Sequence, residues 1–349
     1  MQMSWKMIKR HRNQSSFFWF VHNRTGRRHQ TLFFAPGRTI LRHIMLRVEG
    51  VIAAVFTPVK ENGALNLDVI DRYVDHLVSQ GVLNVFVGGS TGEGVNFSLA
   101  ERKQLTEKWV TAGSGKLQNV IVHVGGVSIP DSQDLARHAE SVGVQGIATL
   151  PTLFFKPQNA DMVAEHLKMM CDAAPNTPLL YYHLPGNTDV NIRIEDLVNA
   201  VEKLGVPTFS GAKFTGSDLR DLRRSIKLFG DRYVFAYGCD EQMLCVLPLG
   251  CKTFIGSTYN YAGRLYNKLI DAYKNGDMET ALRQLDKSQS LVGVLFAHSF
   301  DAGINKQVMS LVSGIDMGPP RYPMVYRSDD EMKQVRSELE EGGFLNGIY

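Results

Sequence analysis

The feature that most constrains the fold is an alternation, repeated eight times from residue 50, between a short apolar run and a longer amphipathic run. The short runs are β-branched and apolar throughout, which is typical of strands covered on both faces of a parallel sheet. The longer runs carry apolar residues at helical spacing. The strands are predicted at residues 51–58, 84–89, 119–126, 146–151, 178–185, 208–215, 233–238 and 253–260. The helices are predicted at residues 66–81, 98–113, 131–143, 159–174, 193–205, 217–230, 241–250 and 261–276.

Eight strand–helix units in about 230 residues match the length of a (β/α)8 barrel. We therefore predict an α/β fold, a TIM barrel over residues 49–278, followed by a C-terminal helical layer over residues 279–349. An open doubly wound sheet is the alternative, but it usually has fewer units, and no G-x-G-x-x-G follows the first strand here. The layer is expected to hold two or three helices, near residues 279–298, 302–313 and 328–341.

Residues 1–48 differ in composition from the rest of the chain. They hold ten of the 38 Lys and Arg residues and no Asp or Glu, which leaves 28 basic and 35 acidic side chains in residues 49–349, a net charge of −7. An Arg-rich, acid-free start resembles a mitochondrial transit peptide. The favoured interpretation is that this extension is disordered or not native, with Met45 as the true start.

The mildly acidic body argues against a nucleic-acid partner. No apolar run approaches the roughly 20 residues of a membrane-spanning helix, so no membrane association is expected. None of the four cysteines lies in a C-x-x-C pair, and no histidine stands near them at zinc-site spacing. A cytoplasmic location is therefore expected, or a mitochondrial one if the extension is a real transit peptide. The cysteines are Cys171, Cys239, Cys245 and Cys251.

In a TIM barrel the chemistry lies at the carboxyl ends of the strands. In "FSGAKFT", Lys213 interrupts a strand of small and apolar residues. A lysine in the barrel mouth loses hydration, which favours the neutral amine that attacks ketones and forms Schiff bases. Tyr182, in the preceding strand, could shuttle protons there, whereas Tyr181 faces the other way. A solvent-seeking lysine and a packed tyrosine are the alternatives.

The glycine loop "GGSTGEG", residues 88–94, follows the second strand. Ser90 and Thr91 offer hydroxyls and backbone N–H groups, and such a nest binds small anions. A phosphate loop would carry a lysine, and Glu93 would repel a multiply charged phosphate. The single carboxylate of a 2-oxo acid fits better, although most glycine runs are simply turns.

The motifs "GGSTGEG", "YYHLP", "GAKFT", "YGCDE" and "GSTYN" resemble, in order and spacing, the N-acetylneuraminate lyase and dihydrodipicolinate synthase family of Schiff-base (β/α)8 aldolases. The resemblance covers residues 50 to about 325. "YGCDE", "GSTYN" and "LVSGIDMGPPRYP" (311–323) are similar to the N-acetylneuraminate lyase (sialic acid aldolase) branch. This resemblance implies a lyase that cleaves N-acetylneuraminate reversibly to pyruvate and N-acetylmannosamine. The reaction would need neither a metal nor a cofactor, and the protein would be a homotetramer.

By the same resemblance, Lys213 is the Schiff-base lysine and Tyr182 the proton-relay tyrosine. The substrate carboxylate is expected at Ser90 and Thr91. The sugar hydroxyls are expected at Thr215, Gly238, Asp240, Glu241 and Ser257.

Two departures and two alternatives accompany this resemblance. Many members carry a tyrosine after the fourth strand that reaches a neighbouring subunit, but Phe154 and Phe155 stand here. His183, beside Tyr182, is expected to be structural because strand neighbours point in opposite directions. Another 2-oxo-acid aldolase of the family would keep Lys213 and Tyr182, and a non-catalytic sugar-acid-binding protein would keep the pocket.

Overall fold

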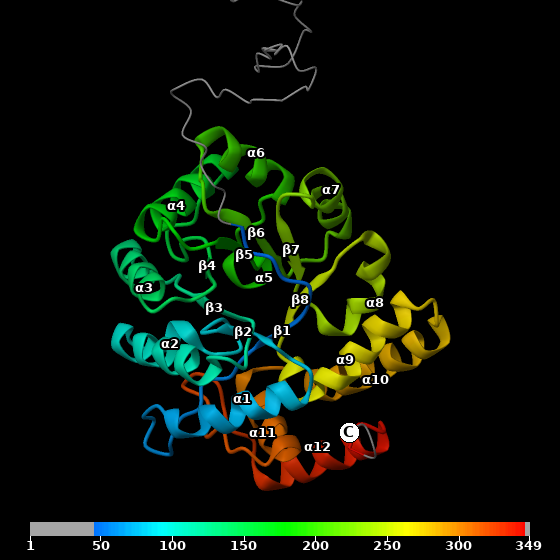
Figure 1. The fold of residues 1–349 in the computed structure, drawn as a ribbon. Coiled ribbons are helices and arrows are strands. Elements are labelled where there is room, and N and C mark those ends of the chain that lie inside the picture. Colours follow the sequence, from blue (N-terminus) through cyan, green and yellow to red (C-terminus); the bar gives the residue numbers. More distant parts are fainter. Residues whose placement is uncertain (1–44, 346–349) are drawn as a thin grey trace, which may run out of the picture. The chain divides into compact units, whose positions relative to one another are not determined.

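The computed structural model describes residues 45–345, and the predictions made for residues 1–44 lie outside this range. Eight parallel strands close into a barrel in sequence order, as predicted (Figure 1). They are β1 (Gly50–Ala54), β2 (Asn84–Val87), β3 (Asn119–His123), β4 (Gly146–Thr149), β5 (Leu179–His183), β6 (Phe209–Phe214), β7 (Val234–Tyr237) and β8 (Thr253–Gly256). The strands end one to four residues earlier than predicted, and the residues that follow them form loops or, for Pro185 and Tyr259, begin a helix.

Helices surround this barrel in the order that the sequence predicts (Figure 1). They are α1 (Ile70–Ser79), α2 (Leu99–Gly113), α3 (Ile129–Ser141), α4 (Ala160–Ala173), α6 (Ile194–Leu204), α7 (Leu219–Phe229), α8 (Met243–Val246) and α9 (Tyr259–Lys274). A one-turn helix that the sequence analysis missed, α5 (Pro185–Thr188), follows β5. Short 3-10 turns flank α1 and α8 (Leu67–Val69, Asp240–Gln242 and Leu247–Leu249), and another lies at Gly94–Asn96.

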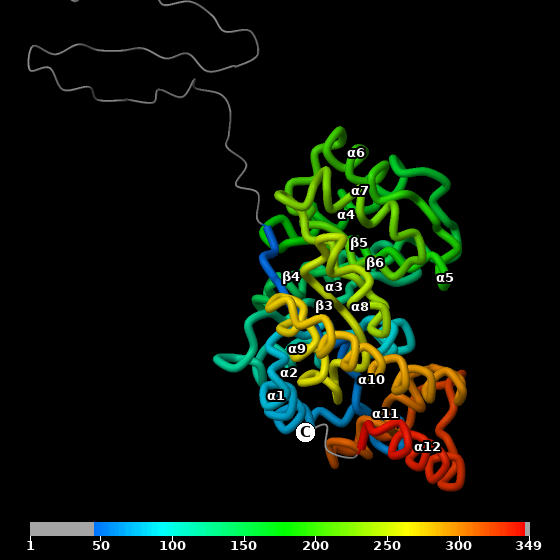
Figure 2. Tube along the Cα trace, turned by 90° about the vertical axis from the view of Figure 1, so that its right-hand side faces the viewer, coloured from blue at the N-terminus to red at the C-terminus, as the bar shows by residue number. Residues whose placement is uncertain are grey.

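Three further helices form the predicted C-terminal layer, α10 (Met278–Ala297), α11 (Ala302–Ser313) and α12 (Asp329–Glu341). Figure 2 shows them together beyond α9, the helix that α10 and α11 contact. None of the helices between residues 45 and 345 combines the length and the apolar character that crossing a bilayer requires.

The start of α2 shows how local sequence sets an element. Ser98 is its N-cap, and its hydroxyl accepts a hydrogen bond from the Glu101 N–H at 3.3 Å. The Glu101 carboxylate accepts in return from the Ser98 N–H at 2.9 Å. This reciprocal capping box satisfies two N–H groups that a helix start leaves unpaired, as the sequence predicts.

The strands separate two apolar cores. One contains helix residues together with strand residues that face outward, such as Val85, Val87 and Tyr181. The other contains strand residues of the opposite parity, such as Phe86 and Tyr182, and fills the barrel interior. Leu46 and Val48 belong to this interior core.

The pairing of β5 with β6 decides where Lys213 points. Leu179 pairs with Phe209, but Leu180 pairs with Gly211, so β6 carries one extra residue, Ser210, in a bulge. In a regular strand Phe209 and Lys213 would share a face, because they are four residues apart. Phe209 faces outward, so the bulge is what turns Lys213 into the barrel.

We predict that Gly211→Ala destabilises the barrel. Gly211 has a φ of +134°, and an added Cβ would lie 1.8 Å from the Val234 carbonyl oxygen. The backbone fixes the position of the Cβ, and the oxygen is itself a backbone atom, so no rotamer change can relieve the clash. The free energy of unfolding should fall by about 2–4 kcal/mol, measured by urea denaturation.

Gly143→Ala is the matched control for that substitution. Gly143 also has a positive φ, +80°, but no atom lies within 4 Å of an added Cβ. Its cost should be limited to backbone strain, about 1 kcal/mol. Equal losses in the two variants would contradict the assignment of the bulge as the constrained point.

Candidate active site

Lys213 and Tyr182 lie side by side in the barrel mouth. They are direct partners in the β5–β6 register. The Lys213 amine donates a hydrogen bond to the Tyr182 hydroxyl at 3.0 Å, and both side chains are buried. The amine also lies 4.2 Å from the Tyr182 ring centroid and 5.1 Å from that of Phe86. The two residues predicted to carry the chemistry therefore form one unit, enclosed by aromatic rings.

Ser90 extends this unit to the glycine loop. Its hydroxyl hydrogen-bonds the Tyr182 hydroxyl at 3.1 Å, so a continuous chain runs from Ser90 through Tyr182 to Lys213. Ser90 is exposed and Thr91 is half-buried. A ligand that enters the barrel mouth can therefore meet the loop and the amine together.

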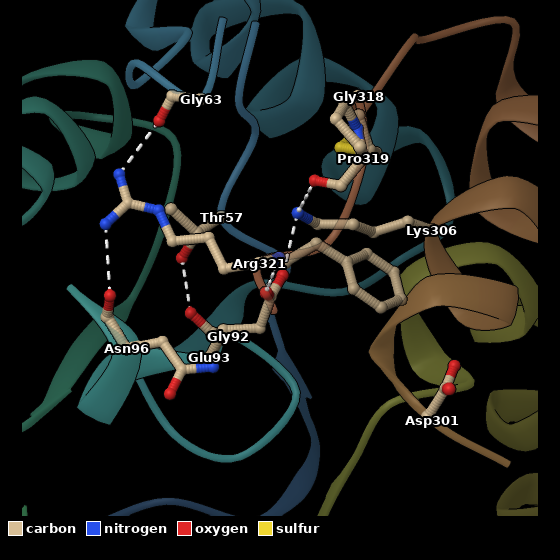
Figure 3. Close-up of polar contacts among 12 residues, drawn as sticks. Thr57, Gly63, Gly92, Glu93, Asn96, Asp301, Lys306, Gly318, Pro319 and Arg321 are labelled. Carbon is tan, nitrogen blue, oxygen red and sulfur yellow. Dashed lines mark hydrogen bonds and ion pairs between the residues drawn. The ribbon is translucent and has the colours of Figure 1, made fainter. Parts of the chain in front are cut away.

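Glu93 does not face this chain. Its carboxylate forms a buried ion pair with Lys306 of α11 at 2.7 Å and also accepts a hydrogen bond from the Arg321 N–H (Figure 3). The expectation that Glu93 repels phosphate at the anion site is therefore wrong. The sequence analysis considered only the residues beside Glu93, and it therefore missed the partner Lys306, which lies more than two hundred residues away in the chain.

Thr215 directly follows β6, the strand of Lys213, and Gly238 directly follows β7, the next strand of the barrel. The Gly238 N–H donates to the Phe214 carbonyl at 2.9 Å, which holds the two loops together. A Cβ on Gly238 would lie 2.0 Å from the Thr215 hydroxyl oxygen and 3.4 Å from Cε of Lys213. Only glycine leaves room here for the Thr215 hydroxyl, which is buried without a hydrogen-bond partner within residues 45–345.

Asp240 follows β7 and is buried against the residues at the end of β8. Its carboxylate accepts hydrogen bonds from the Thr258 N–H at 2.9 Å and from the Thr258 hydroxyl at 2.6 Å. A Cβ on Gly256 would collide with the carboxylate at 1.5 Å, so glycine makes room for it. Burial raises the pKa of Asp240, and the Thr258 hydrogen bonds and the charge of Lys213 offset this only in part.

Glu241 follows Asp240 in the sequence, and Ser257 precedes Thr258, the residue that hydrogen-bonds Asp240. Both side chains are half-buried. Burial raises the pKa of Glu241 above its ordinary value, and the Asp240 charge adds to this rise. The backbone around Ser257 is fixed, because its carbonyl accepts from the Asn260 side-chain amide at 2.7 Å. The residues predicted to bind the sugar thus include one buried carboxylate, that of Asp240, and two half-buried polar side chains, Glu241 and Ser257.

His123 and Arg102 are part of the surroundings that sequence reasoning missed. The His123 ring lies edge-on to Tyr182 at 6.0 Å, and its Nδ1 lies 3.1 Å from the Gly88 carbonyl. Burial and the neighbouring Arg102 charge lower the pKa of His123 to about 3. His123 is therefore a neutral ring beside Tyr182, and it contacts the carbonyl of Gly88, the first residue of the loop that carries Ser90. Its position at the end of "NVIVH" is the signal that could have identified it.

His183 lies on the opposite face of β5 from Tyr182, as strand alternation predicts. Its ring stacks on Phe214 with centroids 5.1 Å apart. The four cysteines are all free. Within residues 45–345, no cluster of three or more histidine, cysteine and acidic side chains is placed to hold a metal ion.

The comparisons with known proteins agree with this geometry. Residues 47–342 match the model of the dihydrodipicolinate synthetase family. An N-acetylneuraminate lyase from Gallus gallus is 43% identical over 296 residues, which are 84% of this chain and 96% of that protein. One from Danio rerio is 45% identical over 283 residues, 80% of this chain and 91% of that protein.

A solved structure shows the same fold. The N-acetylneuraminate lyase of Proteus mirabilis superposes with a TM-score of 0.82 at 34% sequence identity, covering 86% of this chain and all of that one. With the barrel, the paired lysine and tyrosine and the glycine loop in place, the family match over residues 47–342 is decisive. The chain belongs to the dihydrodipicolinate synthetase family.

Proposed function

We propose that the chain is a Schiff-base aldolase that reversibly cleaves N-acetylneuraminate to pyruvate and N-acetylmannosamine. The observation that carries the proposal is the contact of the Lys213 amine with the Tyr182 hydroxyl, 3.0 Å long and buried in the barrel mouth. N-acetylneuraminate lyases at 43% and 45% identity support the choice of substrate.

Lys213 is the nucleophile of the proposed reaction. Its neutral amine attacks the C2 ketone of the open-chain sugar acid, and loss of water gives an imine. Once protonated, the imine nitrogen draws electrons from the neighbouring C3–C4 bond. The substrate carboxylate meets the hydroxyls and N–H groups of Ser90 and Thr91, which hold C2 against the amine.

Tyr182 is the general base for bond cleavage. It relays the proton of the C4 hydroxyl: its oxygen takes that proton while its own phenolic proton passes to the substrate carboxylate, the C3–C4 bond breaks, and the electron pair moves into the imine to give an enamine. N-acetylmannosamine leaves as the aldehyde. The enamine is protonated at C3 and hydrolysed, which releases pyruvate and restores Lys213. Ser90 supports Tyr182 because its hydroxyl hydrogen-bonds the phenol oxygen at 3.1 Å.

The sugar chain is proposed to lie along Thr215, Gly238, Asp240, Glu241 and Ser257. Carboxylates accept hydrogen bonds from hydroxyl groups, so Glu241 suits a polyol. Asp240 already accepts two hydrogen bonds from Thr258, which leaves its other oxygen for a ligand or for packing against Gly256. The reaction needs no cofactor, since the imine itself polarises the substrate. Four free cysteines fit the reducing cytoplasm.

Lys213→Ala should abolish pyruvate release from N-acetylneuraminate. Removal of the nucleophile should lower kcat by about 10⁴-fold or more. Cyanoborohydride with pyruvate should add a reduced adduct to the wild type at Lys213, seen by peptide mass spectrometry, and none to the variant. Lys252→Ala is the control, because Lys252 is an exposed surface lysine paired only with Glu49 at 3.3 Å.

The two alternatives give different results in this experiment. Another 2-oxo-acid aldolase would form the pyruvate adduct at Lys213 but release no pyruvate from N-acetylneuraminate. A sugar-acid-binding protein would bind N-acetylneuraminate without adduct or release. Either pattern in the wild type would overturn the proposed function.

Tyr182→Phe should separate imine formation from bond cleavage. We expect kcat for cleavage to fall by about 10²–10³-fold, while the pyruvate adduct at Lys213 still forms. Tyr181→Phe is the matched control, because the buried Tyr181 hydroxyl has no hydrogen-bond partner within residues 45–345. A Tyr182→Phe enzyme with normal kcat would remove Tyr182 from the mechanism.

We also propose that the protein is a homotetramer. Phe154 and Phe155, on the loop between β4 and α4, are 78% and 85% exposed and lie edge-on at 5.0 Å. Exposed aromatic pairs of this kind are typical of protein contacts. Light scattering after gel filtration should give four times the chain mass. A monomer at micromolar concentration would contradict the proposal.

A further inference from the structure

Glu93 occupies an unfavourable backbone conformation in the loop that carries Ser90 and Thr91. Its φ and ψ are 54° and 27°, in the left-handed region that glycine adopts without strain. Gly92 and Gly94 beside it allow a tight fold, since a Cβ on Gly94 would lie 1.8 Å from the Gly88 carbonyl oxygen. A glutamate between two glycines is therefore retained at a cost, which suggests that its side chain is needed.

Both carboxylate oxygens of Glu93 are engaged by the C-terminal layer (Figure 3). Oε1 lies 2.7 Å from the Lys306 amine, and Oε2 accepts the Arg321 N–H at 2.6 Å. The side chains of Glu93 and Lys306 are both 0% exposed. The Lys306 amine also donates to the Pro319 carbonyl at 3.0 Å. A charge without solvent depends on its partner, so each of these side chains requires the other.

Arg321 extends the contact to the residues that follow the loop. Its guanidinium donates to the Asn96 carbonyl at 3.0 Å and to the Gly63 carbonyl at 2.9 Å, and it pairs with Glu101. It also lies 3.9 Å from the Phe97 ring centroid. The C-terminal layer thus holds the loop and the start of α2 as one piece.

The other end of the loop meets the active site. Ser90 hydrogen-bonds Tyr182, and the Thr57 hydroxyl donates to the Gly92 carbonyl at 2.6 Å. The Thr57 hydrogen bond thus ties Gly92 of the loop to the segment after β1, and the Ser90 hydrogen bond ties the loop to Tyr182. Glu93, three residues from Ser90, is the point at which the C-terminal layer can set the loop's conformation.

We propose that Lys306, acting through Glu93, is a positioning residue that holds loop 88–94 in the conformation that binds the carboxylate of the 2-oxo acid. This inference rests on the proposed function, in which Ser90 and Thr91 bind that carboxylate. Lys306 touches neither substrate nor Lys213. Its effect is on recognition of the carboxylate and not on the amine's ability to form an imine.

Pyruvate and acetone separate these two properties. Acetone is pyruvate with the carboxylate replaced by a methyl group, so both can form an imine at Lys213 but only pyruvate uses the loop. The measurement is the rate of cyanoborohydride trapping per unit concentration of each ketone, followed by mass spectrometry. Loss of general structure lowers both rates, whereas loss of the loop conformation lowers the pyruvate rate alone.

Lys306→Met should lower the ratio of the pyruvate rate to the acetone rate by about tenfold, with the acetone rate within about twofold of wild type. In the synthesis direction the KM for pyruvate should rise with little change in kcat, because the lost contact serves bound pyruvate and the transition state equally. The variants are compared at a temperature where circular dichroism shows each to be folded.

Arg327→Met is the matched control. Arg327 is also a buried cation of the C-terminal layer, 3.0 Å from Asp301, but within residues 45–345 its hydrogen bonds go to residues 298–307 and 325 and none to loop 88–94. It should lose stability without a change in the pyruvate-to-acetone ratio. A ratio that falls equally in both variants would show a general effect of the layer and overturn the proposal.

Lys306→Met leaves Glu93 buried without a counter-charge and can fail to fold. The double variant Glu93→Gln with Lys306→Met removes both charges and should regain thermal stability, since a neutral replacement of a buried pair is tolerated. Its ratio should stay low. A wild-type ratio in the double variant would overturn the proposal, whereas a wild-type enzyme that forms no pyruvate adduct would instead overturn the proposed function.

Discussion

The pairing of Tyr182 with Lys213 across β5 and β6 is the constraint on which the rest of the site depends. Neighbouring strands in a parallel barrel place partners at one height and on one face, so the amine and the phenol meet without any loop to aim them. The bulge at Ser210 is required for this, because a regular β6 would send Lys213 toward the helices. Gly211, with its positive φ, is the residue that makes the bulge possible.

The regular part of the fold was predictable because its causes are local. Eight apolar runs predicted eight strands, and the pair of Ser98 and Glu101 indicated the start of a helix. The inward direction of Lys213 was also predicted, but from the needs of its chemistry, since nothing in "FSGAKFT" alone reveals a bulge. Register between strands depends on how two segments pair, and single-segment patterns do not contain that information.

The residues that sequence reasoning placed wrongly or missed act over long separations. Glu93 was interpreted through its neighbours in the glycine loop, although its partner is Lys306. His123 on β3 meets Tyr182 and the Gly88 carbonyl, and Arg102 on α2 donates to the His123 carbonyl, only in the closed barrel. Asp240 stays a predicted sugar-side residue, but its partner Thr258, which donates two hydrogen bonds to its carboxylate, was missed. In each case the decisive contact joins segments that no local pattern connects.

The C-terminal layer reaches both halves of the site by different means. On the carboxylate side the link is the charged pair of Glu93 and Lys306. On the sugar side it is a chain of neutral groups that runs from Asp240 through Thr258 and Tyr266 to Ser288 of α10. An ionised Asp240 can only accept, so Thr258 donates to it, Tyr266 donates to Thr258, and Ser288 donates to Tyr266.

These two links have different physical consequences. Each hydroxyl of the chain can donate or accept, so the chain stays hydrogen-bonded if Asp240 gains a proton. The ion pair has no such freedom, because two opposite charges that are both buried must stay together. A rigid loop suits the proposed binding of a carboxylate that every 2-oxo acid presents in the same way, whereas the buried Asp240 is held through hydroxyls that can reorient. The helices beyond the barrel therefore contact both halves of the proposed site, through Lys306 of α11 and Ser288 of α10.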